Sequence, residues 1–276
     1  MFGSTVLDLA VGLIFTFLMV SLITSATTEA FASALKLRAS TLCQGIKDLL
    51  NDQQFNGLAL SVYNHALVNS QATGVAQTEA ALTAKPSYID ATHFANAMID
   101  LAGLTAGMSV QDLQTKVNAN IKDPQLQQMF NGIVERTGGD IDRIRGEISD
   151  WFNSGMTRVA GSYKRKTQLW SFVIALLLTI ALNIDTLKIA NALWLQPSLV
   201  KMIEPSTSAV DALSQFGALP LPYGWDKSKF EALADAPMLL GALLGWLMTA
   251  VATLFGAPFW FDSLQKITQV RGAGSK

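Results

Sequence analysis

Few side chains in this sequence could take part in acid–base, nucleophilic or metal chemistry. The 276 residues include two histidines, His65 and His93, and one cysteine, Cys43. Each histidine stands alone in a helical context, "YNHALV" and "YIDATHFA", so a metal site or a general base would need partners that only folding could supply. We therefore expect two structural or surface histidines. One cysteine excludes an intramolecular disulfide and a cysteine-based metal cluster, and an inert thiol is favoured over a palmitoylated one.

The densest group of carboxylates lies between residues 140 and 150 and comprises Asp140, Asp142, Glu147 and Asp150. Arg143 and Arg145 balance these charges, which favours a solvated helix face over a catalytic carboxylate pair. The sequence contains no phosphate-binding glycine loop, no G-x-S-x-G, no H-E-x-x-H and no C-x-x-C motif. The net charge is −1, so the composition does not indicate a basic surface that would bind nucleic acid. We expect no enzyme activity, no cofactor, no metal, no nucleic acid and no small-molecule substrate.

The elements that carry these side chains are dominated by apolar segments. Hydrophobic residues make up 50% of the chain and charged residues 15%, against about 25% charged in ordinary soluble domains. Three blocks hold most of the excess: residues 6–24, 169–184 and 238–257. A membrane-spanning helix needs about 20 mostly apolar residues, a length that the third block reaches without any charge. The first block is slightly short and can be extended by the small residues that follow it.

The second block begins abruptly after three cations, in "YKRKTQLWSFVIALLL". It is also short, but Ile184, Leu187 and Ile189 can lengthen it at the far end. Asp185 and Lys188 in that extension are spaced i,i+3 and could pair. The sequence therefore predicts three transmembrane helices.

Basic residues near the segment ends predict the orientation, because they favour the cytoplasmic side. They follow the first block, precede the second and follow the third, and are diluted among acidic residues between the second and third. The N-terminus and the 193–236 loop are thus expected outside, and residues 25–168 and the C-terminus inside. The "ASA" at 32–34 resembles a signal-peptidase site, but residues 1–8 lack the basic stretch of a signal peptide, so we expect an uncleaved helix.

The predicted fold class is an all-α integral membrane protein, with three transmembrane helices and a cytoplasmic helical domain inserted between the first and second spans. The predicted parts are an N-terminal transmembrane helix with its cytoplasmic extension (1–40), a cytoplasmic helical domain ending in an amphipathic helix (41–165), a second transmembrane helix (166–192), an extracytoplasmic loop (193–236), a third transmembrane helix (237–258) and an interfacial C-terminal tail (259–276). The expected membrane-interface residues are Lys164, Arg165, Lys166, Trp170, Phe259, Trp260 and Phe261.

Local signals give detail within the helical domain. Ser109 and Asp123-Pro124 are typical helix starts, and Gly138-Gly139 is a typical helix end. A new helix should begin near Asp140, bury an apolar face and run to the membrane at Lys164, where it either ends or continues into the second span. Residues 69–87 are poor in large apolar side chains and favour a flexible loop, or a weakly held helix around 79–83.

The later segments carry proline-based predictions. "LPLPYGW" at 219–225 cannot be a regular helix, because two prolines and a glycine interrupt it. Pro258 should end the third span, and Asp262 should then begin a short helix along the membrane surface or the soluble domain.

Small and polar residues recur at i,i+4 spacing in the spans. The expected helix-packing rows are Gly241, Gly245, Thr249 and Thr253 in the third span, and Ser171, Ala175, Thr179 and Asn183 in the second. Small residues let helices approach closely in lipid, so packing is the favoured reading, with a pore-facing row as the alternative. No span has a central charge, and Asp8, Glu29, Asp185 and Asp262 are expected to be solvated near the interfaces.

Several stretches resemble a family of uncharacterised bacterial inner-membrane proteins. They are "WFNSGMTRVAGSYKRKTQ", "ALNIDTLKIANALW", "LPYGW" and "LLGWLMTAVATLFGAPFWFDSLQK", together with "YNHALV" and "KPSYIDATHFANAMIDL". The resemblance spans most of the chain, and the "GAPFWFD" element is fairly specific. It implies a location in the bacterial inner membrane and brings no catalytic residue.

Three classes of function follow. The first is a non-enzymatic membrane anchor or scaffold whose cytoplasmic helical domain engages a protein partner. The alternative is a subunit of a homo-oligomeric channel or pore, and a membrane enzyme is least favoured. The positions of Thr179, Asn183 and Thr249 discriminate between the first two: burial between the spans of one subunit favours the anchor, and convergence on a hydrated axis favours the channel.

Overall fold

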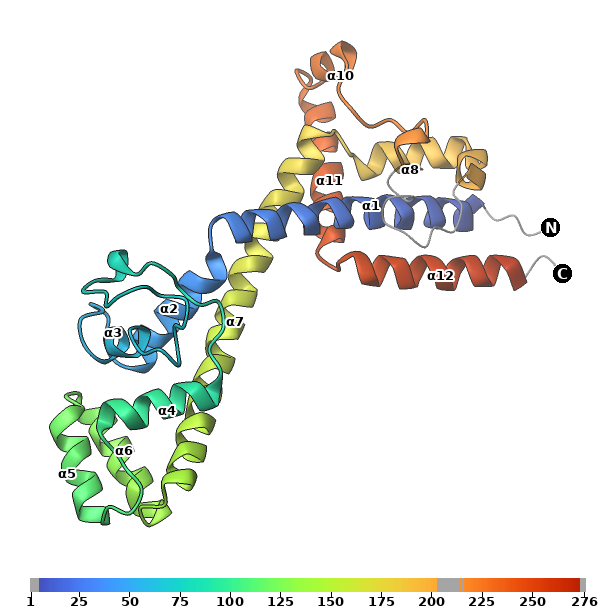
Figure 1. Ribbon diagram of the computed structural model, residues 1–276. Helices are drawn as coiled ribbons and strands as arrows, with labels where there is room; N and C mark the ends of the chain where they lie inside the picture. Colours follow the sequence, from blue (N-terminus) through green and yellow to red (C-terminus); the bar gives the residue numbers. More distant parts are fainter. Residues whose placement is uncertain (1–4, 203–213, 215, 274–276) are drawn as a thin grey trace. The chain divides into compact units, whose positions relative to one another are not determined.

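The structure is a computed structural model that describes residues 5–202, 214 and 216–273 (Figure 1). The parts of the predicted 193–236 loop and C-terminal tail that fall in 203–213, 215 and 274–276 lie outside the described residues. All regular elements within the described ranges are helices, with no strand. The chain divides into two compact units. We call residues 32–165 the middle unit, and residues 1–31 with 166–276 the membrane unit.

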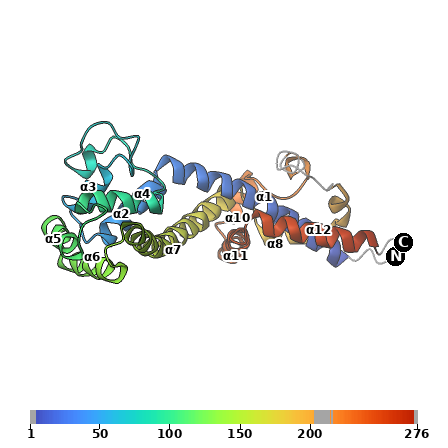
Figure 2. The same ribbon diagram turned by 60° about the horizontal axis from the view of Figure 1, so that its bottom comes forward.

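The middle unit is a helical domain with its own apolar core. Its complete helices are α2 (Leu37–Leu49), α3 (Leu58–Tyr63), α4 (Ala91–Ala102), α5 (Val110–Asn120) and α6 (Pro124–Thr137). They pack with the first turns of α7 (Ile141–Ala181), as Figure 2 shows. Phe94 stacks on Phe152 of α7 with ring centroids 4.2 Å apart, and Phe130 lies edge-on to Trp151. The core is thus closed by aromatic side chains from three helices.

Local capping residues set the helix ends of the middle unit, and these predictions are confirmed. The Ser109 hydroxyl accepts the backbone N–H of Asp112 at 3.1 Å, and Asp123 accepts that of Leu126 at 2.8 Å. Gly138 ends α6 in the left-handed region at φ 64°, where a side chain would be strained. Asp140 then accepts the first free N–H groups of α7.

Helix α7 is continuous for 41 residues. Its N-terminal part buries Ile144, Ile148 and Phe152 in the middle unit, as the helical spacing predicts. Its C-terminal part is the apolar second block. The predicted continuation of the amphipathic helix into this block is confirmed.

The segment between α3 and α4 contains one 3-10 turn, η1 (Glu79–Ala81), where a loop or a weak helix was predicted. Asparagine side chains hold the rest of this segment. Asn64 exchanges two hydrogen bonds with the backbone of Ala76, and Asn69 donates to the carbonyl of Ala84 at 2.9 Å.

The membrane unit contains α1 (Thr5–Ala34) as far as residue 31, the end of α7, α8 (Thr186–Leu195), η2 (Pro197–Met202), α10 (Lys227–Ala232), α11 (Ala236–Thr253) and α12 (Ala257–Ala273). Helices α8 and α12 run alongside α1 in both views (Figures 1 and 2). Leu193 of α8 packs directly on Gly12 of α1, and Trp260 of α12 lies 4.9 Å from the ring of Phe17.

Two helices, α1 and α11, are long and apolar enough to cross a membrane. Helices α7 and α8 meet the same test only as a pair, bent by 54° at a short break, so the described residues hold two candidate spans, or three if the bent pair is one. The expectation of an all-helical fold with candidate membrane spans is confirmed among the described residues.

The helix predicted over 166–192 is interrupted, because α7 ends at Ala181 and α8 starts at Thr186. Asn183 adopts a left-handed φ of 47°. The N–H of Ile184 bonds to the carbonyl of Thr179, and that of Asn183 to Ile180, which is the Schellman pattern of a helix end. Asp185 then caps the N-terminus of α8. Local sequence therefore both stops one helix and starts the next.

The third span is also shorter than predicted, ending at Thr253 rather than at 258. The chain turns at Gly256, whose φ is 82°, and α12 begins at Ala257. Pro258 lies in the first turn of α12, where proline is tolerated, so it starts a helix instead of ending one. Asp262 consequently lies inside α12, and its predicted role as a helix start is wrong. The non-helical "LPLPYGW" segment is confirmed.

Candidate functional site at a helix break

The break between α7 and α8 gathers buried polar side chains in the membrane unit. Asn183, Asp185 and Thr186 are each at most 3% exposed. The expectation that Asp185 is solvated at an interface is therefore wrong. Burial of polar groups in an apolar unit is costly unless each is bonded, so their partners define what the site does.

Asn183 joins α7 to α11 and to the 222–225 segment. Its Oδ1 accepts the indole N–H of Trp246 at 3.1 Å, and its Nδ2 donates to the carbonyl of Gly224 at 3.0 Å. The N–H of Gly224 in turn donates to the carbonyl of Leu182 at 2.7 Å, and the indole of Trp225 donates to that of Ile180 at 2.9 Å. The carbonyls of Ile180 and Leu182 at the end of α7 thus accept hydrogen bonds from the 224–225 segment.

Thr249 of α11 binds the other side of the break. Its hydroxyl lies 2.9 Å from the carbonyl of Ile184 and 2.7 Å from the hydroxyl of Thr186. It lies equally close to the carbonyl of Gly245, one turn earlier in α11. This threonine belongs to the predicted packing row and here connects two helices through polar contacts.

Asp185 occupies the start of α8. Its Oδ1 accepts the N–H groups of Leu187 at 2.9 Å and Lys188 at 3.2 Å. The predicted pair with the Lys188 ammonium is present at 3.5 Å. A Cβ at position 245 would overlap this carboxylate, so only glycine there lets α11 approach the break.

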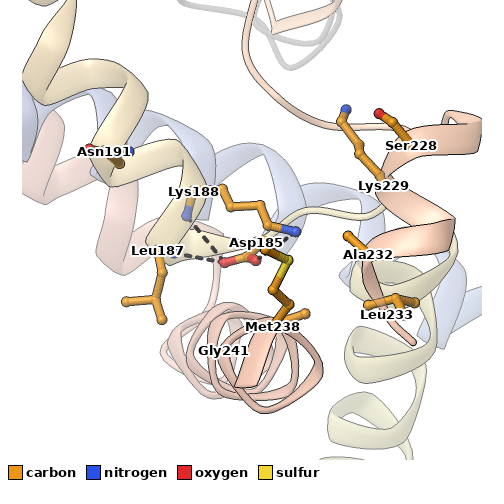
Figure 3. A pocket seen from close by; sticks show the side chains of 11 residues that line it. Asp185, Leu187, Lys188, Asn191, Ser228, Lys229, Ala232, Leu233, Met238 and Gly241 are labelled. Atoms are coloured by element: carbon orange, nitrogen blue, oxygen red, sulfur yellow. Dashed lines mark hydrogen bonds and ion pairs between the residues drawn. The ribbon is translucent and has the colours of Figure 1, made fainter. Parts of the chain in front are cut away.

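A cavity of about 460 Å³ opens beside Asp185 (Figure 3). Its lining comes from α8, α10 and α11 and from Asp185 itself: Asp185, Leu187, Lys188, Asn191, Ser228, Lys229, Ala232, Leu233, Met238, Gly241 and Ala242. Lys229 is held by the carbonyls of Tyr223 and Gly224, each at 3.2 Å, and by Asp226 at 3.5 Å. A hydrogen bond from Ser228, and then one from the backbone N–H of Lys229, lower the pKa of Asp226. The cavity combines apolar walls with a cationic edge.

The remaining packing-row residues lie as follows. Ala175, Thr179 and Thr253 are buried, while Ser171 is half-buried. Gly241 has nothing within 4 Å of an added Cβ, because it faces the cavity. In the predicted row on α11, Gly245, Thr249 and Thr253 therefore make packing contacts, and Gly241 lines the cavity.

The predicted membrane-interface residues differ in how exposed their side chains are. Lys164, Arg165 and Lys166 are exposed, as are Trp170 and Phe259. Trp170 packs against Phe31 with ring centroids 5.0 Å apart. Trp260 and Phe261 are half-buried, and the Trp260 indole donates to the carbonyl of Ala252 at 2.8 Å. Trp260 therefore also closes the C-terminus of α11.

The structure gives His65 and two of the 140–150 carboxylates partners of opposite charge. His65 lies 3.4 Å from Asp100, and His93 is exposed. Arg145 pairs with Asp142, and Arg136 with Glu147 at 3.0 Å. No group of three or more potential metal ligands occurs among the residues that the structure describes.

Cys43 belongs to a polar cluster in the middle unit. Glu79 of η1 accepts from Lys85 at 2.7 Å and Lys47 at 3.1 Å, and the Cys43 thiol lies 3.7 Å from it. These lysines, Lys85 first, lower the pKa of Glu79. Burial, and then the charge of Glu79, raise the pKa of Cys43, and burial raises that of Tyr63 beyond its usual range. The cluster fastens η1 to α2, and the burial and raised pKa of Cys43 both oppose formation of a thiolate.

Sequence reasoning missed Trp246, Gly224 and Thr186 as members of the helix break. An Asn followed two residues later by an Asp before an apolar stretch is a stop-and-start signal that was available at Asn183 and Asp185. The partners on α11 carry no such local signal.

Family models, curated proteins and solved structures were all compared with the chain, and none matches it. The resemblance to bacterial inner-membrane proteins therefore stays a prediction.

Proposed function

We propose that this protein is a non-enzymatic anchor or scaffold of the bacterial inner membrane. In this proposal the bent pair α7–α8 counts as the second of three spans. The N-terminus and the 193–236 loop are outside, and the middle unit and the C-terminus are cytoplasmic. The middle unit engages a protein partner.

The observation that carries this proposal is the continuity of α7. The same helix supplies Ile148 and Phe152 to the core of the middle unit, and Ala175 and Thr179 to the buried part of the membrane unit. A helix whose two halves are both packed in this way fastens a folded domain to an apolar one. Such a connection suits an anchor.

The polar rows support the anchor over the channel. Thr179, Asn183 and Thr249 are fully buried within one chain. Asn183 and Thr249 bond to protein groups across the break, and Thr179 bonds to the carbonyl of Leu176 at 2.9 Å. Side chains satisfied in this way leave no polar wall for a conduit in a single subunit.

A different observation keeps the homo-oligomeric channel as the second candidate. The hydroxyls of Ser21, Thr24 and Thr28 on α1 are buried without a hydrogen-bond partner in the described structure. Unpartnered polar groups at successive turns of a span would suit a polar path formed by several subunits.

The test is site-specific photo-cross-linking in native membranes, with the full-length chain tagged after Lys276. A photoreactive residue replaces Tyr88 or Val75, both well exposed on the middle unit, and Phe230 on α10 is the matched control of similar exposure. We expect one protein to be cross-linked in near-stoichiometric yield from the middle-unit positions and not from Phe230.

Cross-links only between copies of this chain would contradict the anchor. Conductance of the purified oligomer in bilayers would then decide for the channel.

A further inference from the structure

The cavity extends from Asp185, which contacts the middle of α11 at Gly245, to Met238 in the first turn of α11. Helix α11 has 18 residues, which at about 1.5 Å per residue matches about the thickness of the hydrocarbon core. If α11 crosses the membrane, its first turn reaches the headgroup region and the cavity opens there. Met238, Gly241 and Ala242 belong to its first two turns and line the cavity.

The carboxylates around the cavity are already satisfied. Asp185 accepts two backbone N–H groups of α8, and Asp226 accepts the Ser228 hydroxyl at 2.6 Å and the N–H of Lys229 at 2.8 Å. Lys229 is likewise saturated by the carbonyls of Pro222, Tyr223 and Gly224. These groups shape the cavity but offer little to a ligand.

Lys188 and Asn191 are different. The Lys188 ammonium makes one long ion pair of 3.5 Å and no hydrogen bond among the described residues. Asn191 lies three residues later, on the same face of α8, and its side chain makes no hydrogen bond within that same part of the chain. Figure 3 shows both at the cavity, with Lys188 next to Asp185. An ammonium held by a single 3.5 Å ion pair and an amide on the same helix face can both still donate to an oxyanion.

The rest of the lining is apolar and is provided mainly by Leu187, Leu233 and Met238. Leu187 and Met238 are also well exposed to the surroundings. A ligand with hydrocarbon next to its anionic group fits this combination better than a wholly polar one, because exposed apolar side chains at the cavity mouth would cover its chain.

We propose that this cavity binds one anionic phospholipid, with its phosphate on Lys188 and Asn191 and the start of an acyl chain against Leu187 and Met238. The site is independent of the proposed anchor function and of which side of the membrane the cavity faces.

The test is native mass spectrometry of the full-length protein in mild detergent, titrated with phosphatidylglycerol, with phosphatidylethanolamine or with soluble glycerol phosphate. We expect one phosphatidylglycerol to be retained about tenfold more strongly than phosphatidylethanolamine, since a difference of that size corresponds to one charge-assisted contact. Glycerol phosphate should not be retained.

Two variants address the site by different routes. Lys188→Gln removes the cation, and Gly241→Leu fills the cavity from a position where an added Cβ meets nothing within 4 Å. Each should lower phosphatidylglycerol retention about tenfold, as expected for loss of one charge-assisted contact or of the space for the ligand.

The matched controls are Lys227→Gln, an exposed lysine of α10 outside the cavity, and Gly146→Leu, an open glycine on the exposed face of α7. Both should retain the lipid as the wild type does, and thermal unfolding in the same detergent identifies any variant that fails to fold. Equal retention in wild type and both site variants would overturn the proposal. Equal retention of the two lipids would overturn the anionic specificity, and retention of glycerol phosphate would assign the site to a soluble phosphate compound.

Discussion

Gly245 determines how closely α11 can approach the helix break. The carboxylate of Asp185 occupies the space that a side chain at position 245 would need, and that carboxylate is fixed by two N–H groups of α8. The Asp185 carboxylate cannot move aside without losing these hydrogen bonds, which cap the N-terminus of α8. At the residue scale, the absence of a side chain at position 245 is therefore what allows α11 to contact the start of α8.

Replacing Gly245 by alanine should destabilise the membrane unit by about 1–3 kcal/mol, the usual cost of an extra carbon in a packed site. Gly241→Ala is the matched control, because it makes the same change on the same helix in open space. Unfolding of both variants in detergent micelles measures the difference. If both variants unfold like the wild type, the close contact with Asp185 is not formed.

Glu79 gives the middle unit a pH-dependent contact. Lys85 and Lys47 hold the pKa of its carboxyl below the ordinary 4.5, so pairing stabilises the fold above that pH and is lost as the pH falls through the lower folded pKa. We expect the wild type to melt above Glu79→Gln at pH 7, and the two to melt together near pH 3. Calorimetry at both pH values measures this, and a gap that stays constant with pH would contradict it.

The end of α7 shows how an element can be fixed by residues distant in sequence. Asn183 makes its two side-chain bonds to residues 41 and 63 positions away. Without it, the indole N–H of Trp246 and the carbonyl of Gly224 would each lose their hydrogen bond to this side chain. The break is therefore held by its own cap and by α11 together.

Asn183→Gly keeps the left-handed backbone and removes both side-chain bonds. It should cost about 1–3 kcal/mol, because the buried indole N–H of Trp246 is left without a partner, while the Gly224 carbonyl keeps its bond from Lys229. Asn183→Ala adds the strain of a side chain at positive φ, about 1 kcal/mol more. Chemical unfolding in detergent compares them. A glycine variant as stable as the wild type would show that the bonds to Trp246 and Gly224 contribute nothing.

Predictions from sequence succeeded where the signal was local. The caps at Ser109 and Asp123, the end at Gly138 and the buried face of α7 each depend on residues within one or two turns. The bend at Asn183 was missed because the span was predicted by counting apolar residues, and such a count continues through Asn183 to Ile184, Leu187 and Ile189. The site around it needed α11 and the 222–225 segment, which only folding brings together.

At the scale of the whole molecule, one folded unit contains the candidate spans α1 and α11, and the other contains a separate apolar core. The central question is whether the bent pair α7–α8 crosses the membrane or returns to the side it came from. Its polar break does not decide this, because a bonded break suits either a broken span or a re-entrant loop. The three-span proposal requires a crossing.

The most direct measurement is labelling of single introduced cysteines with a membrane-impermeant maleimide in intact cells and in permeabilised cells. The exposed positions Gln111 in the middle unit and Lys227 in α10 are each replaced by cysteine, and the wild type is the control because Cys43 is buried. The account predicts that cysteine at 227 is labelled in intact cells and cysteine at 111 only after permeabilisation. Labelling of both positions from the same side would contradict the three-span anchor.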